Sequence, residues 1–101
     1  DCILIIRTLL IKAKRILKLI ESKKDNENID EIITRFKPPI FWKDKEIVKQ
    51  QINCWTYNGI ENLTYRISEI ELLIKKNPFS SVNILSDFII EQSSVVNNKI
   101  L

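Results

Sequence analysis

The side chains that could do chemistry are few, and their spacing does not suggest a catalytic site. The chain has no histidine and a single glycine, so it holds neither a histidine-based acid–base pair nor a glycine-rich phosphate loop. Glu69 and Glu71 stand two residues apart on a predicted helix, as do Asp44 and Glu46, so the members of each pair point to different faces. We therefore predict no catalytic residue and no enzymatic activity in this chain.

The two cysteines, Cys2 and Cys54, are the remaining candidates for a metal or redox site. They lack the spacing of a zinc-binding pair, and no histidine is present to complete a ligand set. We expect two separate, buried thiols rather than a disulfide. No metal and no cofactor are predicted.

Length and composition indicate one soluble helical domain spanning residues 1–101. Hydrophobic residues make up 45% and charged residues 29%, and one Gly with three Pro favours long helices over many turns. Arg7, Lys12, Lys14 and Arg15 interrupt the apolar start of the chain before the roughly 20 residues that a bilayer requires. We predict an all-α, compact bundle of about five helices, cytoplasmic and without membrane contact.

The first predicted helix covers residues 1–22. Its polar side carries Arg7, Lys14, Arg15 and Lys18, which could meet phosphates or simply keep the helix solvated. The helix opens on an apolar run without a capping residue, so we expect it to begin close to, or inside, a helix of a longer protein. Its inward face is predicted to hold Ile6, Leu9, Leu10, Ala13, Ile16, Leu17 and Ile20.

Two shorter helices are predicted next, after a polar link at residues 23–28. Asn28 should open the first of them, with Glu31 three residues later completing a capping box, and Pro38 and Pro39 should end it. The next helix is predicted over residues 43–55. Their inward faces are predicted to hold Ile29, Ile32, Ile33 and Phe36 in the first, and Val48, Ile52 and Trp55 in the second.

The longest helix is predicted over residues 57–76, with Thr56 as its cap or Asn58 as the alternative. Pro78 separates it from a last helix over residues 81–92, and residues 93–101 are expected to form a frayed tail. The long helix has an apolar stripe spaced 3-4-3-4, made of Ile60, Leu63, Ile67, Ile70 and Ile74. The last helix is predicted to face inward with Val82, Leu85, Phe88 and Ile89.

Two helices carry a second pair of apolar residues away from the predicted core. Leu4 and Ile11 lie amid the basic side of the first helix, and Tyr65 and Leu72 lie far round the long helix from its stripe. Scattered surface apolar residues are common, but pairs spaced seven apart on two helices favour a protein–protein contact. We predict that these four residues form a subunit interface.

The segment Phe36-Lys37-Pro38-Pro39-Ile40-Phe41-Trp42-Lys43 is unusual in placing two aromatic residues after two prolines. Both rings could pack as a plug over the helix ends. Alternatively, one could anchor in the core while the other reaches a partner or stacks on a base. The flanking lysines make Lys37, Phe41, Trp42 and Lys43 the candidate DNA contacts.

The order of these features resembles a known family. Arg7 in an apolar first helix, KPPIFWKDK at 37–45, Gln51, Trp55 before a cap, and ELLIK at 71–75 are together similar to the C-terminal third of the DNA polymerase III delta subunit, as found in alphaproteobacteria. The resemblance covers essentially the whole chain. Trp42 stands where that family more often has Phe, and Asp44 makes the segment less basic than in the family.

This resemblance implies a role in the bacterial clamp loader, the ATP-driven complex that places the sliding clamp on primed DNA during replication. The chain would be the C-terminal collar domain of a longer subunit, packing against the gamma/tau and delta-prime subunits without chemistry of its own. The sliding clamp would be contacted only by an N-terminal domain that lies outside this sequence, and any contact with DNA would be indirect. The alternative hypothesis is a stand-alone nucleic-acid-binding helical domain that uses the first-helix lysines together with Phe41 and Trp42.

Overall fold

The computed structural model describes residues 1–23 and 28–100, of which residues 94–100 are described by their backbone alone. This part of the chain is all-helical, as predicted, with five α-helices and no strand. The predicted polar link falls largely outside the described residues. In order, the elements are α1 (Cys2–Ser22), α2 (Ile29–Arg35), the short 3₁₀ helix η1 (Trp42–Asp44), α3 (Lys45–Cys54), α4 (Tyr57–Lys76), the 3₁₀ helix η2 (Pro78–Ser80) and α5 (Ser81–Ile100).

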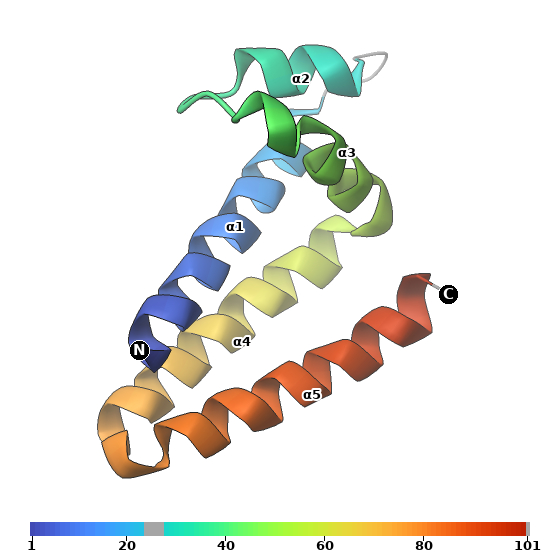
Figure 1. Ribbon diagram of the computed structural model, residues 1–101. Helices are drawn as coiled ribbons and strands as arrows, with labels where there is room; N and C mark the ends of the chain where they lie inside the picture. Colours follow the sequence, from blue (N-terminus) through green and yellow to red (C-terminus); the bar gives the residue numbers. More distant parts are fainter. Residues whose placement is uncertain (24–27, 101) are drawn as a thin grey trace.

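Three long helices build the body, and two short ones cover one end of it (Figure 1). α1 and α4 run antiparallel and pack against each other, and α5 folds back from α4 through η2. α2 and α3 lie across the end where α1 finishes and α4 begins. The radius of gyration is 14.9 Å, above the roughly 13 Å expected for a compact domain of 100 residues. The bundle is therefore elongated and has more surface than a spherical domain of its length.

Local capping explains where the helices begin. The Thr56 side chain accepts a hydrogen bond from the Gly59 backbone N–H at 3.0 Å, which confirms the predicted start of α4. Asn28 likewise accepts from the Asp30 N–H at 2.8 Å. The prediction that α1 has no cap is wrong, because Asp1 accepts from the Ile3 N–H at 3.1 Å.

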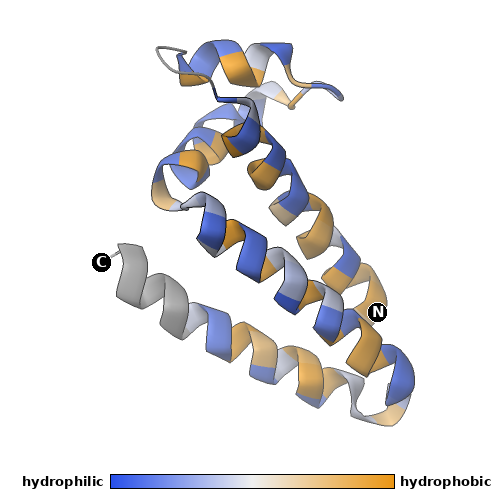
Figure 2. Ribbon diagram, turned by 180° about the vertical axis from the view of Figure 1, so that it is seen from behind, coloured by the Kyte–Doolittle hydropathy of each residue, from blue (hydrophilic) through white to orange (hydrophobic). Residues whose placement is uncertain are grey.

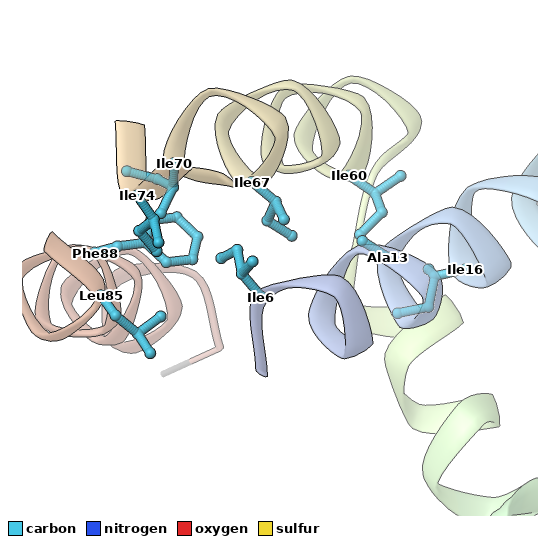
Figure 3. Close-up of a cluster of buried hydrophobic side chains, with 9 residues drawn as sticks. All are labelled: Ile6, Ala13, Ile16, Ile60, Ile67, Ile70, Ile74, Leu85 and Phe88. Carbon is cyan, nitrogen blue, oxygen red and sulfur yellow. The ribbon is translucent and has the colours of Figure 1, made fainter. Parts of the chain in front are cut away.

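The main core lies between α1, α4 and α5. The predicted stripe of α4 is buried except for Leu63, which is partly exposed but packs against the same cluster. Figure 3 shows Ile6 of α1 and Ile67 of α4 pointing toward one another, with Phe88 of α5 beside them. The buried members of this cluster are Ile6, Ala13, Ile16, Ile60, Ile67, Ile70, Ile74, Leu85 and Phe88.

A second, smaller core holds the short helices against the end of α1. Leu19 is fully buried there, although the helical pattern of α1 did not place it on the inward face. It lies on a different side of α1 from Ile6 and Ala13, so the two ends of this helix face different neighbours. The buried members are Leu19, Ile32, Ile33, Ile40, Val48 and Ile52.

α5 departs most from expectation. It continues to Ile100, so the predicted end at residue 92 and the frayed tail over residues 93–100 are wrong, while residue 101 lies outside the described residues. Leu85 and Phe88 face inward as predicted, but Val82 and Ile89 are exposed. α5 packs into the main core through Leu85 and Phe88, and the described part of the chain does not bury Val82 and Ile89 on either side of them. In the rear view, coloured by hydropathy, hydrophobic and hydrophilic residues alternate along the long helices (Figure 2).

We predict that Ile67→Ala lowers the free energy of unfolding by about 2–5 kcal/mol, because it opens a cavity between α1 and α4 that the helices cannot fully close. Urea denaturation followed by circular dichroism measures this change. The matched control is Ile90→Ala on the exposed side of α5, which should cost far less. Equal losses in the two variants would contradict the assigned core.

Candidate functional site

The four residues predicted as an interface all lie on the surface. Leu4, Ile11, Tyr65 and Leu72 are between 53% and 68% exposed. We call these four side chains the outer face. Exposure of two such residues on each of two adjacent helices leaves apolar area that the chain itself does not cover.

An ion cluster joins α1 and α4 along one side of the helix pair. Arg7 Nε lies 3.5 Å from Glu71 Oε2, and Lys75 Nζ lies 2.7 Å from the same oxygen. Arg7 stands between Leu4 and Ile11 along one side of α1, and Leu72 directly follows Glu71 on α4. The cluster therefore marks a seam with one apolar pair on each side of it.

The charges in this seam stabilise the ionised carboxylate. The hydrogen bond and charge of Lys75, together with the more distant Arg7, lower the pKa of Glu71 below its ordinary value. The Glu71 side chain is only 16% exposed, whereas most ion-pair members here are more open. One carboxylate thus contacts a basic residue of each helix, Arg7 of α1 and Lys75 of α4.

A second polar contact marks the other end of the same flank. The Tyr57 hydroxyl donates to Glu61 Oε2 at 3.1 Å, and this bond raises the pKa of Tyr57. The charge of Glu61 raises this pKa as well, and Glu21 at the end of α1 adds a smaller effect.

α5 packs on a different side. The Arg66 guanidinium donates to both carboxylate oxygens of Glu91, at 3.1 and 3.3 Å, joining α4 to α5. The pairing raises the pKa of Arg66 and lowers that of Glu91. On α1, Leu9 and Ile16 face α5 and lie roughly opposite Ile11 at 100° per residue. The outer face is therefore turned away from α5 and stays open.

A cleft of about 450 Å³ lies between α5 and the other helices. Most of its wall is apolar, and Gln51 and Lys12 are among its few polar residues. The Gln51 Oε1 atom is buried without a hydrogen-bond partner. The same holds for the Nε atom of Arg15, a residue that the sequence analysis predicted to lie on a solvated side of α1. The cleft is lined by Leu9, Lys12, Ala13, Ile16, Gln51, Trp55, Ile60, Leu63, Ile67, Phe88, Ile89, Gln92 and Ser93.

The aromatic segment does not form the plug that was one interpretation of the sequence. Ile40 is the buried residue of this stretch, and both Phe41 and Trp42 are mostly exposed, at 56% and 68%. The hypothesis that one of the two rings anchors in the core is also wrong, because Ile40 takes that position. Lys37 and Lys43 are exposed beside the rings.

The groups considered for catalysis or metal binding are not brought together. Glu69 pairs with Arg66 at 3.8 Å, whereas Glu71 pairs with Arg7 and Lys75. Cys2 is partly buried and Cys54 is exposed, so the expectation of a buried Cys54 thiol is wrong; both thiols are free. Among residues 1–23 and 28–100, no cluster of ligand-type side chains could hold a metal ion, and no helix is long and apolar enough to cross a membrane.

Phe79 and Ile90 are among the exposed apolar residues that the sequence analysis did not single out. Phe79 in η2 is fully exposed, and Ile90 of α5 is exposed beside Ile89. Phe79 follows Pro78 at the predicted break between two helices. An aromatic residue at such a turn could have indicated that its side chain is exposed. Ile90 could not be distinguished from a core residue by its type.

We predict that Gln51→Leu stabilises the fold or leaves it unchanged, because it removes a buried oxygen that lacks a partner, whose burial costs about 1–3 kcal/mol. Thermal unfolding gives the comparison. Gln50→Leu, at an exposed site on the same helix, is the control for adding a leucine. A clear loss of stability in Gln51→Leu alone would mean that this carboxamide has a structural role.

The lowered pKa of Glu71 gives a pH prediction. A carboxylate whose pKa is depressed by folding contributes stability above its unfolded pKa and loses it as the pH falls through the folded pKa. Glu71→Gln should therefore lower the melting temperature at neutral pH, and the difference from the unmodified chain should vanish at an acid pH at which this carboxyl group is protonated in the folded chain as well. Glu46→Gln, on the exposed side of α3, is the control. A difference that persists at that acid pH would show that the ion cluster is not its cause.

Comparison of the chain with family models, curated proteins and solved structures finds no match. Its function must therefore be argued from its own residues and their arrangement.

Proposed function

We propose that this chain is a non-catalytic assembly module that binds sister subunits through the exposed apolar sides of α1, α4 and α5. The observation that carries the proposal is the outer face: Leu4, Ile11, Tyr65 and Leu72 remain exposed on the outward sides of the antiparallel helices α1 and α4. Burying apolar surface is the main favourable term in association, and a partner would remove these side chains from water.

The polar groups along this flank suit an interface. Arg7, Glu71 and Lys75 already neutralise one another in part, so a partner covering them would not bury an isolated charge. Tyr65 offers a large ring with a hydroxyl, a residue type enriched where binding energy concentrates. On α5, Val82, Ile89 and Ile90 add exposed apolar area on a separate side. Two separate apolar surfaces would allow two different neighbours.

The more specific form of the proposal is the collar domain of a clamp-loader delta subunit. Its support is the order of residues that resembles that family, from Arg7 through KPPIFWKDK to ELLIK. A collar domain would hold neighbouring subunits in place while other domains work on the sliding clamp and DNA. An exposed apolar surface, beside which no catalytic or metal-binding site was identified among the described residues, fits such a holding role. The partners would be the gamma/tau and delta-prime subunits.

We predict that the double variant Ile11→Ala with Leu72→Ala binds these partners roughly tenfold more weakly, because two apolar contacts are lost. Gel filtration of the chain with the gamma and delta-prime subunits of its own source measures complex formation. Ile47→Ala removes an equally exposed isoleucine from α3 and should bind normally.

Unchanged assembly by the double variant would refute the outer face as the contact. Absence of any complex with the unmodified chain would refute the clamp-loader assignment. The reading frame upstream of Asp1 is an independent check on that assignment, which expects α/β sequence without a phosphate loop.

A further inference from the structure

The segment that joins α2 to α3 displays two aromatic rings in a fixed way. Ile40 is buried in the second core and ties the segment to α3 and α1. Directly after it, the Asp44 N–H donates to the Phe41 carbonyl at 2.9 Å, closing the turn of η1. Phe41 and Trp42 therefore project from a backbone held at both ends rather than from a loose loop.

The two rings leave flat surfaces open to a ligand. Their centroids are 5.9 Å apart and their planes are tilted by 50°, so they do not cover each other by stacking. Lys43 Nζ lies 5.4 Å from the centroid of the Trp42 ring. Trp and Phe usually bury most of their apolar area. Two neighbouring rings that both remain exposed suggest a surface for binding.

The charge around the rings favours an anionic ligand. Lys37, Lys43 and Lys45 are exposed on this segment, whereas the nearby Asp44 is partly buried. The Arg35 Nη2 atom donates to the Ser22 carbonyl at 3.1 Å, which fastens the end of α2 to the end of α1. Glu46, which follows Lys45, is exposed as well, so the three lysines outnumber the two acidic residues at this end of the segment.

We propose that this segment, Lys37 to Lys45, binds single-stranded nucleic acid, with bases stacking on Phe41 and Trp42 and lysines contacting phosphates. Single strands combine flat faces with regularly spaced negative charge, and proteins recognise them by aromatic stacking within a basic groove. An anionic membrane shares the charge, but η1 is too short to provide the broad apolar face of an interfacial helix. The site lies apart from the outer face and goes beyond the assembly role.

The test is fluorescence anisotropy of the whole chain with short labelled oligo(dT) and oligo(U), with a duplex and with phosphatidylserine vesicles as comparisons. We expect single strands to bind and the duplex and vesicles to bind far more weakly; the two oligonucleotides distinguish DNA from RNA. Trp42→Ala should weaken binding by about tenfold or more. Phe79→Ala, which removes an even more exposed ring at the other end of the bundle, should leave it unchanged.

Salt dependence supplies a second readout. Lys43→Ala should reduce the slope of log affinity against log salt by roughly 0.7, the value for one phosphate contact on a single strand. No binding of single strands at low salt, equal binding by Trp42→Ala, or preference for vesicles would each overturn the proposal. The double variant at Ile11 and Leu72 should bind single strands normally, which separates this result from the fate of the assembly role.

Discussion

The packing of α1 against α4 is the interaction on which the rest of the structure depends. These two helices make the most extensive contact in the described part of the chain, and Ile6, Ile60 and Ile67 are almost completely buried there. Because a helix has a fixed number of residues per turn, burying these positions also fixes which residues point outward. The exposure of Ile11 and Leu72 is thus a geometric consequence of the core and not a separate feature.

The polar contacts place the remaining parts relative to this pair. The cluster of Arg7, Glu71 and Lys75 spans one flank, and the Arg66–Glu91 pair fastens α5 on a different side of α4. Such pairs are partly exposed, and each contributes on the order of 0–1 kcal/mol to stability. Their main effect is to fix how the helices lie relative to one another. The surface is thereby divided into an open flank, a cleft beneath α5, and an end covered by α2 and α3.

Periodicity predicted the parts of the fold in which a helix keeps the same buried side along its whole length. The bounds of α4, its Thr56 cap and its buried stripe all follow from residue type and spacing. It failed where a helix changes neighbours, as at Leu19, or where a helix has too few neighbours, as at Val82 and Ile89. A helical pattern identifies an apolar side but not whether anything covers it.

The exposure of individual side chains was harder to predict than the helix bounds, because it depends on tertiary contacts. The position of Ile40 decided that Phe41 and Trp42 are exposed, and no pattern within the segment distinguished this from a packed plug. Arg15 has charged neighbours in the sequence, which predicted a solvated position. It is nevertheless partly buried, because α1 meets other elements there. For the outer face, by contrast, the sequence identified all four exposed residues, since they stand far round their helices from the core positions.

The central claim is that the outer face is open in the free chain and covered in an assembly. Methyl NMR with a soluble nitroxide measures this directly, because the probe broadens only the methyl groups that it can reach. In the free chain, Leu4, Ile11 and Leu72 should be broadened and Ile6 and Ile67 protected. In complex with the gamma and delta-prime subunits, the outer methyl groups should become protected as well. Outer methyl groups that stay broadened in the complex, or that are protected in the free chain, would contradict the account.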